Sequence, residues 1–176
     1  MYDFEDLDGF LDHLSMVVMP NVPTALAGGL DEVGREIEEL AVKKFGEYQP
    51  KVGPFPAWPS LAPSTKEYRV SKGFSEDEPL YRTGRTRDSI KYHVDGDNVV
   101  VGSSEVTMVY HEMGTTSEPP RPVLGPAMYQ SKHRINEILG RATVLAIVPG
   151  LMMEKVAGFR STGKKLTNPR YNKYRR

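Results

Sequence analysis

The stretch that decides the fold runs from Leu80 to Met128 and reads LYRTGRTRDSIKYHVDGDNVVVGSSEVTMVYHEMGTTSEPPRPVLGPAM. Apolar side chains alternate with more polar ones on both sides of Asp95-Gly96-Asp97-Asn98, at Tyr92, Val94, Val99 and Val101. A period of two is typical of half-buried strands, and the four turn residues tolerate unusual backbone angles. The pattern predicts a β-hairpin, and the apolar segment from Val106 to Met113 predicts a return to the same sheet.

Helices are predicted on both sides of this stretch. In residues 24–46 the apolar side chains follow steps of four and three, which places them on one helix face. This helix begins at Thr24, or at Asp31 if Gly28-Gly29 interrupts it. Residues 126–148 repeat the pattern, with Pro126 suited to the first helical position and Pro149-Gly150 as the stop. We therefore expect an α+β fold, in which a small antiparallel sheet carries both long helices on one face.

The rest of the chain divides into a loop and two extended termini. Residues 46–79 contain six prolines, which exclude a continuous helix, so we expect a long loop available for subunit contact. Trp58 is expected to pin this loop to the core. Residues 1–22 are expected to form an acidic amphipathic arm whose helix ends before Met19-Pro20. Residues 23–150 form the expected domain, and residues 151–176 a basic tail.

Charge is distributed unevenly, although the net charge is zero. Residues 1–50 contain 11 acidic and 3 basic side chains, whereas residues 155–176 contain 8 basic and none acidic. One interpretation is a solvated acidic helix face with a disordered basic tail. The other is electrostatic matching between subunits or adjoining rings. No apolar run approaches a membrane span, and the acidic N-terminus is unlike a secretory signal, so we expect a soluble protein used without export.

The sequence offers no convincing catalytic or metal site. It has no cysteine, and His111-Glu112 fails as a zinc-protease motif because position 115 is Thr rather than a second histidine. Three arginines, Arg82, Arg85 and Arg87, could hold phosphate, or could pair with Asp88 or with acids of a neighbouring subunit. We therefore expect a protein that is not an enzyme, with no cofactor and no sequence-specific nucleic-acid binding.

Several short motifs follow one another in a characteristic order. Arg82-Thr83-Gly84-Arg85 is followed by a hairpin ending at Val101-Gly102-Ser103, then by Tyr110-His111-Glu112-Met113-Gly114 and by Pro120-Arg121-Pro122-Val123-Leu124-Gly125-Pro126-Ala127. Trp58-Pro59-Ser60-Leu61-Ala62-Pro63-Ser64-Thr65 precedes them. Over about residues 22–148 this order resembles the tail-completion, or virion morphogenesis, family of tailed bacteriophages.

The resemblance implies a structural protein of the virion neck, at the head-tail junction, made in the host cytoplasm. It implies a tail-completion or head-tail connector component that forms a homo-oligomeric ring, with a hexamer favoured and a dodecamer possible. Expected partners are the head-side connector, the tail terminator or tail tube protein, and phage DNA passing non-specifically through the lumen, but no membrane. A tail terminator that caps the tail tube is the main alternative, and a DNA-binding module is a weaker one.

The expected subunit and partner contacts are made by one tryptophan and ten cations. Arg121 lies between Pro120 and Pro122, which should hold it in one place opposite a carboxylate within or across subunits. The full set is Trp58, Arg82, Arg85, Arg87, Arg121, Lys164, Lys165, Arg170, Lys173, Arg175 and Arg176.

Overall fold

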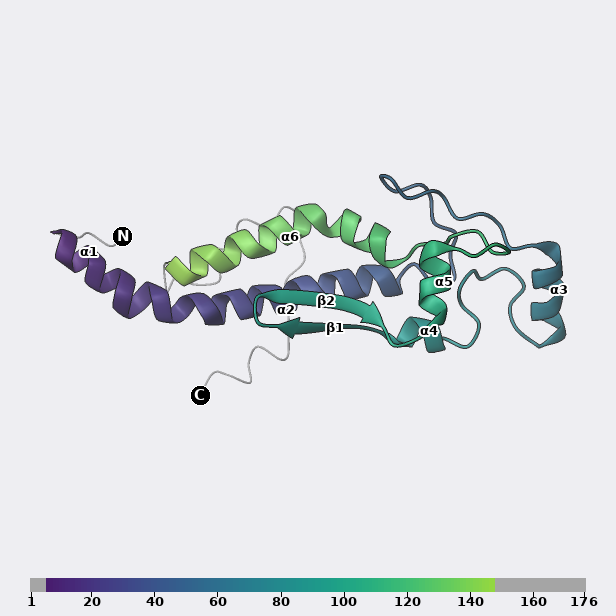
Figure 1. The fold of residues 1–176 in the computed structure, drawn as a ribbon, viewed down its shortest axis with the longest axis horizontal. Helices are drawn as coiled ribbons and strands as arrows, with labels where there is room; N and C mark the ends of the chain where they lie inside the picture. Colours follow the sequence, from purple (N-terminus) through teal and green to yellow (C-terminus); the bar gives the residue numbers. More distant parts are fainter. Residues whose placement is uncertain (1–5, 148–176) are drawn as a thin grey trace.

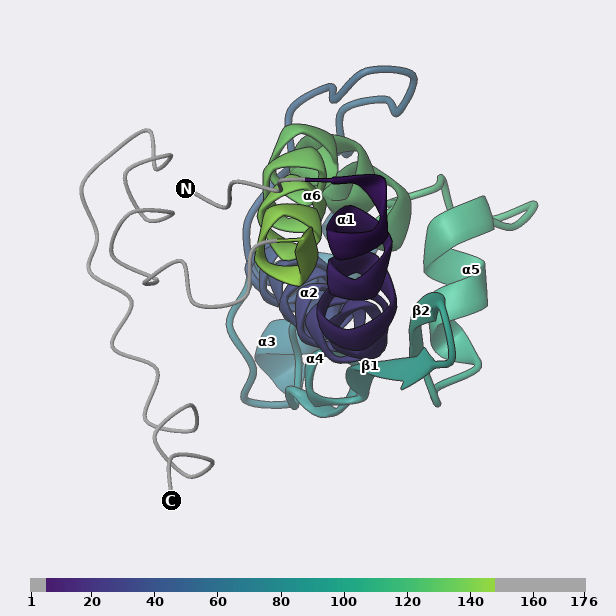
Figure 2. The same cartoon turned by 90° about the vertical axis from the view of Figure 1, so that its left-hand side faces the viewer.

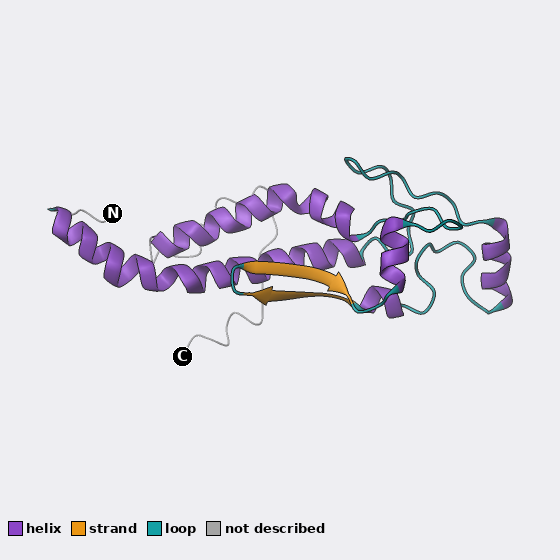
Figure 3. Cartoon of the chain, viewed as in Figure 1, coloured by secondary structure: helices purple, strands orange, loops and turns teal. Residues whose placement is uncertain are grey.

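The computed structural model describes residues 6–147 and has the α+β composition expected, with one antiparallel hairpin among helices (Figures 1 and 3). Its elements, in chain order, are α1 (Leu7–His13), the π-helical segment η1 (Leu14–Val18), α2 (Met19–Val42), α3 (Pro63–Ser71), α4 (Arg85–Asp88), β1 (Ile90–Asp95), β2 (Asn98–Ser103), α5 (Thr107–Met113) and α6 (Leu124–Ile147).

The predicted hairpin is confirmed. Ile90 pairs with Ser103 and Asp95 with Asn98, in a continuous antiparallel register. Gly96 has a φ of +56° at the turn, a conformation that glycine adopts without strain. The predicted long helix is also confirmed as α6, while its predicted stop at Pro149-Gly150 lies outside the described residues.

The helix predicted to end before Met19-Pro20 continues instead, because α1, η1 and α2 follow one another without a break. A π-helical turn is wider than an α-helical one, so η1 gives room for the ring of Pro20 in the next turn. The side-chain amide of Asn21 donates to the carbonyl of Val17 at the same place. Nor does the glycine pair break α2, because Gly29 faces α6, where an added Cβ would lie 2.9 Å from that of Ala142.

α2 is the central layer of the molecule, with the hairpin on one side and α6 on the other (Figures 1 and 2). The expectation that both helices cover one face of the sheet is therefore corrected. A two-stranded sheet is only about as wide as one helix, at roughly 4.8 Å between strands, so it cannot carry two. Buried apolar side chains from all three layers and from the loops form one core: Val33, Ile37, Ala41, Phe45, Trp58, Ile90, Met108, Val123, Ala127 and Ile138.

The hairpin is fixed to α2 through Tyr92. An added Cβ at Gly34 would lie 2.3 Å from Tyr92 Cδ2, so the ring packs directly on the helix backbone. The Tyr92 hydroxyl donates to Asp31 Oδ1 at 2.7 Å, and the Tyr92 amide donates to Glu38 Oε2 at 3.2 Å. Burial of the ring and the Asp31 contact raise the pKa of Tyr92 to about 12.

Three further expectations are wrong. Thr107–Met113 form the helix α5, with Val106 as its N-cap, rather than a third strand. Helical spacing buries Met108 against the core and leaves the other apolar side chains together on the outer face. Within the long loop, residues 63–71 form α3, which starts with Pro63 at a position where its missing N–H costs nothing. Helix α2 itself ends at Val42, short of the predicted 46.

Candidate assembly surface

The loops, α3, α4 and α5 gather at one end of the molecule, beyond the last turns of α2 (Figure 1). This end contains five of the residues that were expected to make subunit contacts: Trp58, Arg82, Arg85, Arg87 and Arg121. Among residues 6–147 no group of side chains is arranged to hold a metal ion, and no helix is long and apolar enough to cross a membrane. The contacts within these loops and short helices decide which side chains this end of the molecule presents.

Trp58 pins the long loop to the core, as predicted. Its side chain is buried, and its indole Nε1 donates to the carbonyl of Pro122 at 3.1 Å. Its backbone amide donates to the carbonyl of Gln49 at 2.9 Å. A buried indole with a satisfied N–H fixes both segments that it touches.

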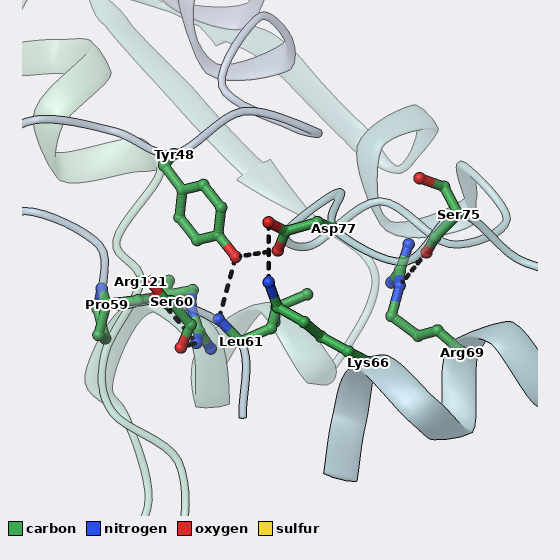
Figure 4. A network of polar contacts seen from close by, with 9 residues as sticks. All are labelled: Tyr48, Pro59, Ser60, Leu61, Lys66, Arg69, Ser75, Asp77 and Arg121. Atoms are coloured by element: carbon green, nitrogen blue, oxygen red, sulfur yellow. Dashed lines mark hydrogen bonds and ion pairs between the residues drawn. The ribbon is translucent and has the colours of Figure 1, made fainter. Parts of the chain in front are cut away.

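Arg121 is held in one place, as expected, but its partners within the chain are carbonyls rather than a carboxylate. The buried guanidinium donates to Pro59 O at 3.1 and 3.3 Å and to Ser60 O at 3.3 Å (Figure 4). The backbone amide of Arg121 donates to His111 O at 2.7 Å. The planar fork of arginine suits two successive carbonyls, so this side chain ties the segment before α6 to the segment after Trp58.

A second polar network orders the loops around α3 (Figure 4). Asp77 accepts hydrogen bonds from the Tyr48 hydroxyl and from Lys66 Nζ, the latter at 2.9 Å. These bonds, from Tyr48 first, lower the pKa of the Asp77 carboxyl. Arg69 is buried and donates to Ser75 O and to Tyr81 O, each at 2.6 Å. Sequence reasoning did not identify this network, because its members are separated by loops of unknown path.

The three arginines around α4 have separate partners inside the chain. Arg85 pairs with Glu105 and Arg87 with Asp88, each with an N–O distance of 2.8 Å. The guanidinium carbons of Arg82 and Arg87 lie 5.7 and 5.0 Å from the ring centroids of Phe74 and Tyr81. Of the two interpretations offered above, the structure favours carboxylate pairing for Arg85 and Arg87. The tail cations Lys164, Lys165, Arg170, Lys173, Arg175 and Arg176 lie outside the described residues.

Glu112 joins α5 to the start of α6. Its Oε1 accepts hydrogen bonds from the amides of Val123 and Leu124, at 2.7 and 2.6 Å. A carboxylate at a helix N-terminus satisfies amides that have no partner within the helix, and it interacts favourably with the helix dipole. His111, beside it, is half-buried, and burial lowers its pKa. In the sequence this pair stands in a family motif and fails as a zinc motif, and neither signal indicates the structural role of Glu112.

The outer face of α5 is apolar and exposed. The side chains of Val106, Val109, Tyr110 and Met113 are 51–80 % exposed, whereas Met108 on the opposite face is buried. We call these four residues the α5 stripe. Their spacing of three, four and seven residues is that of one helix face, and this signal was present in the sequence but was interpreted as a strand.

Comparison with known proteins places the chain in a family by its sequence. No curated protein and no solved structure matches the chain. The family model described as the phage virion morphogenesis family matches residues 3–143, which cover the whole described core except the last turn of α6. The description of this family supports a structural role in phage virion morphogenesis. This chain belongs to the phage virion morphogenesis family.

Proposed function

We propose that this protein is a component of the phage neck, where it forms a homo-oligomeric ring between the head-side connector and the tail. Family membership supports a structural role in the virion. The observation that carries the proposal is the α5 stripe, a solvent-facing row of four apolar side chains on one short helix and its N-cap residue. Contiguous exposed apolar surface of this kind typically marks a protein contact.

The order of the surrounding loops supports the same proposal. Trp58 and Arg121 connect segments more than sixty residues apart in the sequence through hydrogen bonds to backbone carbonyls, and Glu112 connects α5 to the start of α6. Loops held in this way lose little conformational entropy when a partner binds, so more of the contact energy is available for association. The described loops are therefore suited to present a surface that is formed before assembly.

The ring has six subunits in the arrangement that we favour, and twelve in the alternative. The adjoining proteins are the head-side connector and the tail terminator or tail tube, and DNA passes through the lumen without sequence-specific contact. The acidic side chains of residues 1–50 and the basic side chains of residues 155–176 have the complementary charge needed for contact between subunits or adjoining rings.

Particles made without the protein test this role. A neck component is dispensable for the head and for the tail separately, so filled heads and tails of normal length should accumulate unjoined. A tail terminator would instead leave tube growth unchecked and give tails of excessive length. Labelled protein located by electron microscopy should occupy the junction itself, and label found elsewhere would refute the neck assignment.

Gel retardation of duplex DNA separates a DNA-binding module from a neck component. A DNA-binding module would retard the migration of duplex DNA, and its affinity would fall steeply as the salt concentration rises. Removal of residues 160–176 tests the charge matching in the same particles. It deletes seven of the eight basic side chains of residues 155–176, so contacts with an acidic neighbouring ring should be lost, leaving folded protein with unjoined heads and tails. Normal numbers of joined particles from the truncated protein would exclude a joining role for this tail.

A further inference from the structure

A groove lies between the loop that follows α2 and the first turns of α6. It has a volume of about 480 Å³, and its apolar lining includes Phe55, Met128, Tyr129 and Ile135. Backbone hydrogen bonds between Val52 and Phe55, at 2.9 and 3.0 Å, close the loop into a tight turn. The groove is therefore bounded by two ordered segments of the chain.

Two close contacts hold this loop against α6. An added Cβ at Gly125 would lie 2.5 Å from Phe55 Cε1, and one at Gly53 would lie 2.5 Å from Tyr129 Cζ. Gly53 also has a φ of +53°, which favours glycine. The groove exists because glycine stands at both points, so its shape can be changed by a single methyl group.

The groove is long enough to hold the α5 stripe, and both surfaces are apolar. From Val106 to Met113 the stripe extends about 10 Å along its helix, and the α6 wall from Gly125 to Asn136 extends about 16 Å. One surface is convex and the other concave, and both are apolar. α5 stands beside the α2–α6 pair, whereas the loop that follows α2 extends past α6 on another side (Figure 2).

Charge at the edges of the two surfaces is complementary. Lys132 lines the groove and is exposed, and Lys51 is exposed at the base of its loop. Glu118 is exposed in the turn that follows α5 and lies close enough to act electrostatically on His111. Opposite charges around an apolar contact favour one orientation of the two partners.

We propose that the α5 stripe of one copy of this chain binds in the Phe55–Met128 groove of the next copy. The contact joins different surfaces of two identical chains, so it is heterologous, and each bound copy still presents a free stripe or a free groove. Such a contact propagates head to tail and closes into a ring when the rotation between neighbours divides a full turn. It requires self-association, as the proposed function does, but not the neck location.

Disulfide crosslinking tests the pairing, because the chain has no cysteine of its own. The variant that carries both Val109→Cys and Met128→Cys, in purified protein and in assembled particles, should give a ladder of crosslinked species after oxidation, ending at the full ring. An equal mixture of the two single variants should give dimers only, which also excludes a bond within one chain. Each single variant alone should stay monomeric.

Two results would overturn the pairing. If Val109→Cys alone forms dimers, two copies of α5 contact each other in an isologous contact. If the double variant stays monomeric on denaturing gels, the stripe and the groove do not meet. A ring found elsewhere in the virion, with the ladder intact, would reject the neck location and keep this contact. A ring found at the neck without the crosslinked ladder would keep the neck location and reject this contact.

Matched substitutions test each surface separately. Val109→Lys places a charge in the stripe and should weaken self-association at least about tenfold. Val70→Lys makes the same change on α3, where the valine is 57 % exposed against 58 % for Val109, and should have no effect. Gly125→Ala should displace Phe55 and weaken association, whereas Gly140→Ala, whose Cβ meets nothing within 4 Å, should not. Equal effects within either pair contradict the proposal.

Discussion

Removal of the Glu112 carboxylate should destabilise the start of α6. In the native chain, one carboxylate oxygen accepts the amides of Val123 and Leu124 at 2.7 and 2.6 Å. Val123 is fully buried, so its amide has little access to replacement water. Glu112→Ala therefore leaves at least one buried donor without a partner, while Glu112→Gln keeps an acceptor oxygen and removes only the charge.

The expected magnitudes follow from the number and type of these bonds. A hydrogen bond to a charged acceptor contributes about 1.5–3 kcal/mol, and Glu112→Ala removes two. Position 112 is partly exposed, so water can replace part of the loss, and the free energy of unfolding should fall by about 2–4 kcal/mol. Glu112→Gln mainly loses the interaction with the helix dipole, which is about 1 kcal/mol. For a chain of this size these values correspond to losses in Tm of roughly 5–15 °C and roughly 2–4 °C.

Thermal and urea unfolding followed by circular dichroism measure these changes. Glu118→Ala is the matched control, because it removes the same charge from an exposed side chain six residues further on and should change stability by less than about 0.5 kcal/mol. If Glu112→Ala unfolds at the same temperature as Glu118→Ala, the two amides are satisfied in some other way and the role assigned to Glu112 is wrong.

Three other predictions use single substitutions. Gly34→Ala forces a methyl group against Tyr92 and should cost about 1–3 kcal/mol in unfolding free energy, whereas Gly28→Ala, on the same helix in open space, should be neutral or stabilising by up to about 1 kcal/mol. Trp58→Phe leaves the buried Pro122 carbonyl without its donor and should cost about 1–3 kcal/mol in urea unfolding. Burial lowers the pKa of His111 below 6.5, so the unfolded chain binds this proton more readily than the folded chain. The free energy of unfolding should therefore fall as the pH drops below about 6.5 towards the lowered pKa. His111→Gln should reduce this dependence on pH, measured by urea unfolding at several pH values.

The elements that could be predicted from sequence are those whose signals are local. The hairpin has a period of two around a polar turn with glycine at positive φ, and α6 has a long apolar face, so neither needs knowledge of distant residues. The existence of α2 was predictable for the same reason. Its uninterrupted start was not, because the π-helical segment that accommodates Pro20 depends on several neighbouring turns.

The errors arise where the partner is distant in sequence. A run such as Val106–Met113 has valines that favour a strand and a spacing that favours a helix, and the choice depends on the burial of Met108 and on the bonds from Glu112. The carbonyl partners of Arg121 lie about sixty residues away in a loop, so charge pairing suggested a carboxylate instead. The position of α6 on α2 similarly rests on small side chains meeting at Gly29 and Ala142.

Glu112 also connects the two surfaces proposed to join neighbouring subunits. It lies on α5 beside the stripe, and it binds the first amides of α6, whose next turns form one wall of the groove. The number of copies in a closed ring depends on the rotation between these surfaces, which is about 60° per subunit for six copies and about 30° for twelve. Weaker hydrogen bonds between residue 112 and the first amides of α6 would allow a wider range of rotations between the two surfaces without removing either surface. Glu112→Gln combined with Val109→Cys and Met128→Cys should therefore still give a ladder, but with open chains or mixed ring sizes in place of one end point, and a single unchanged ring would show that the rotation is fixed elsewhere.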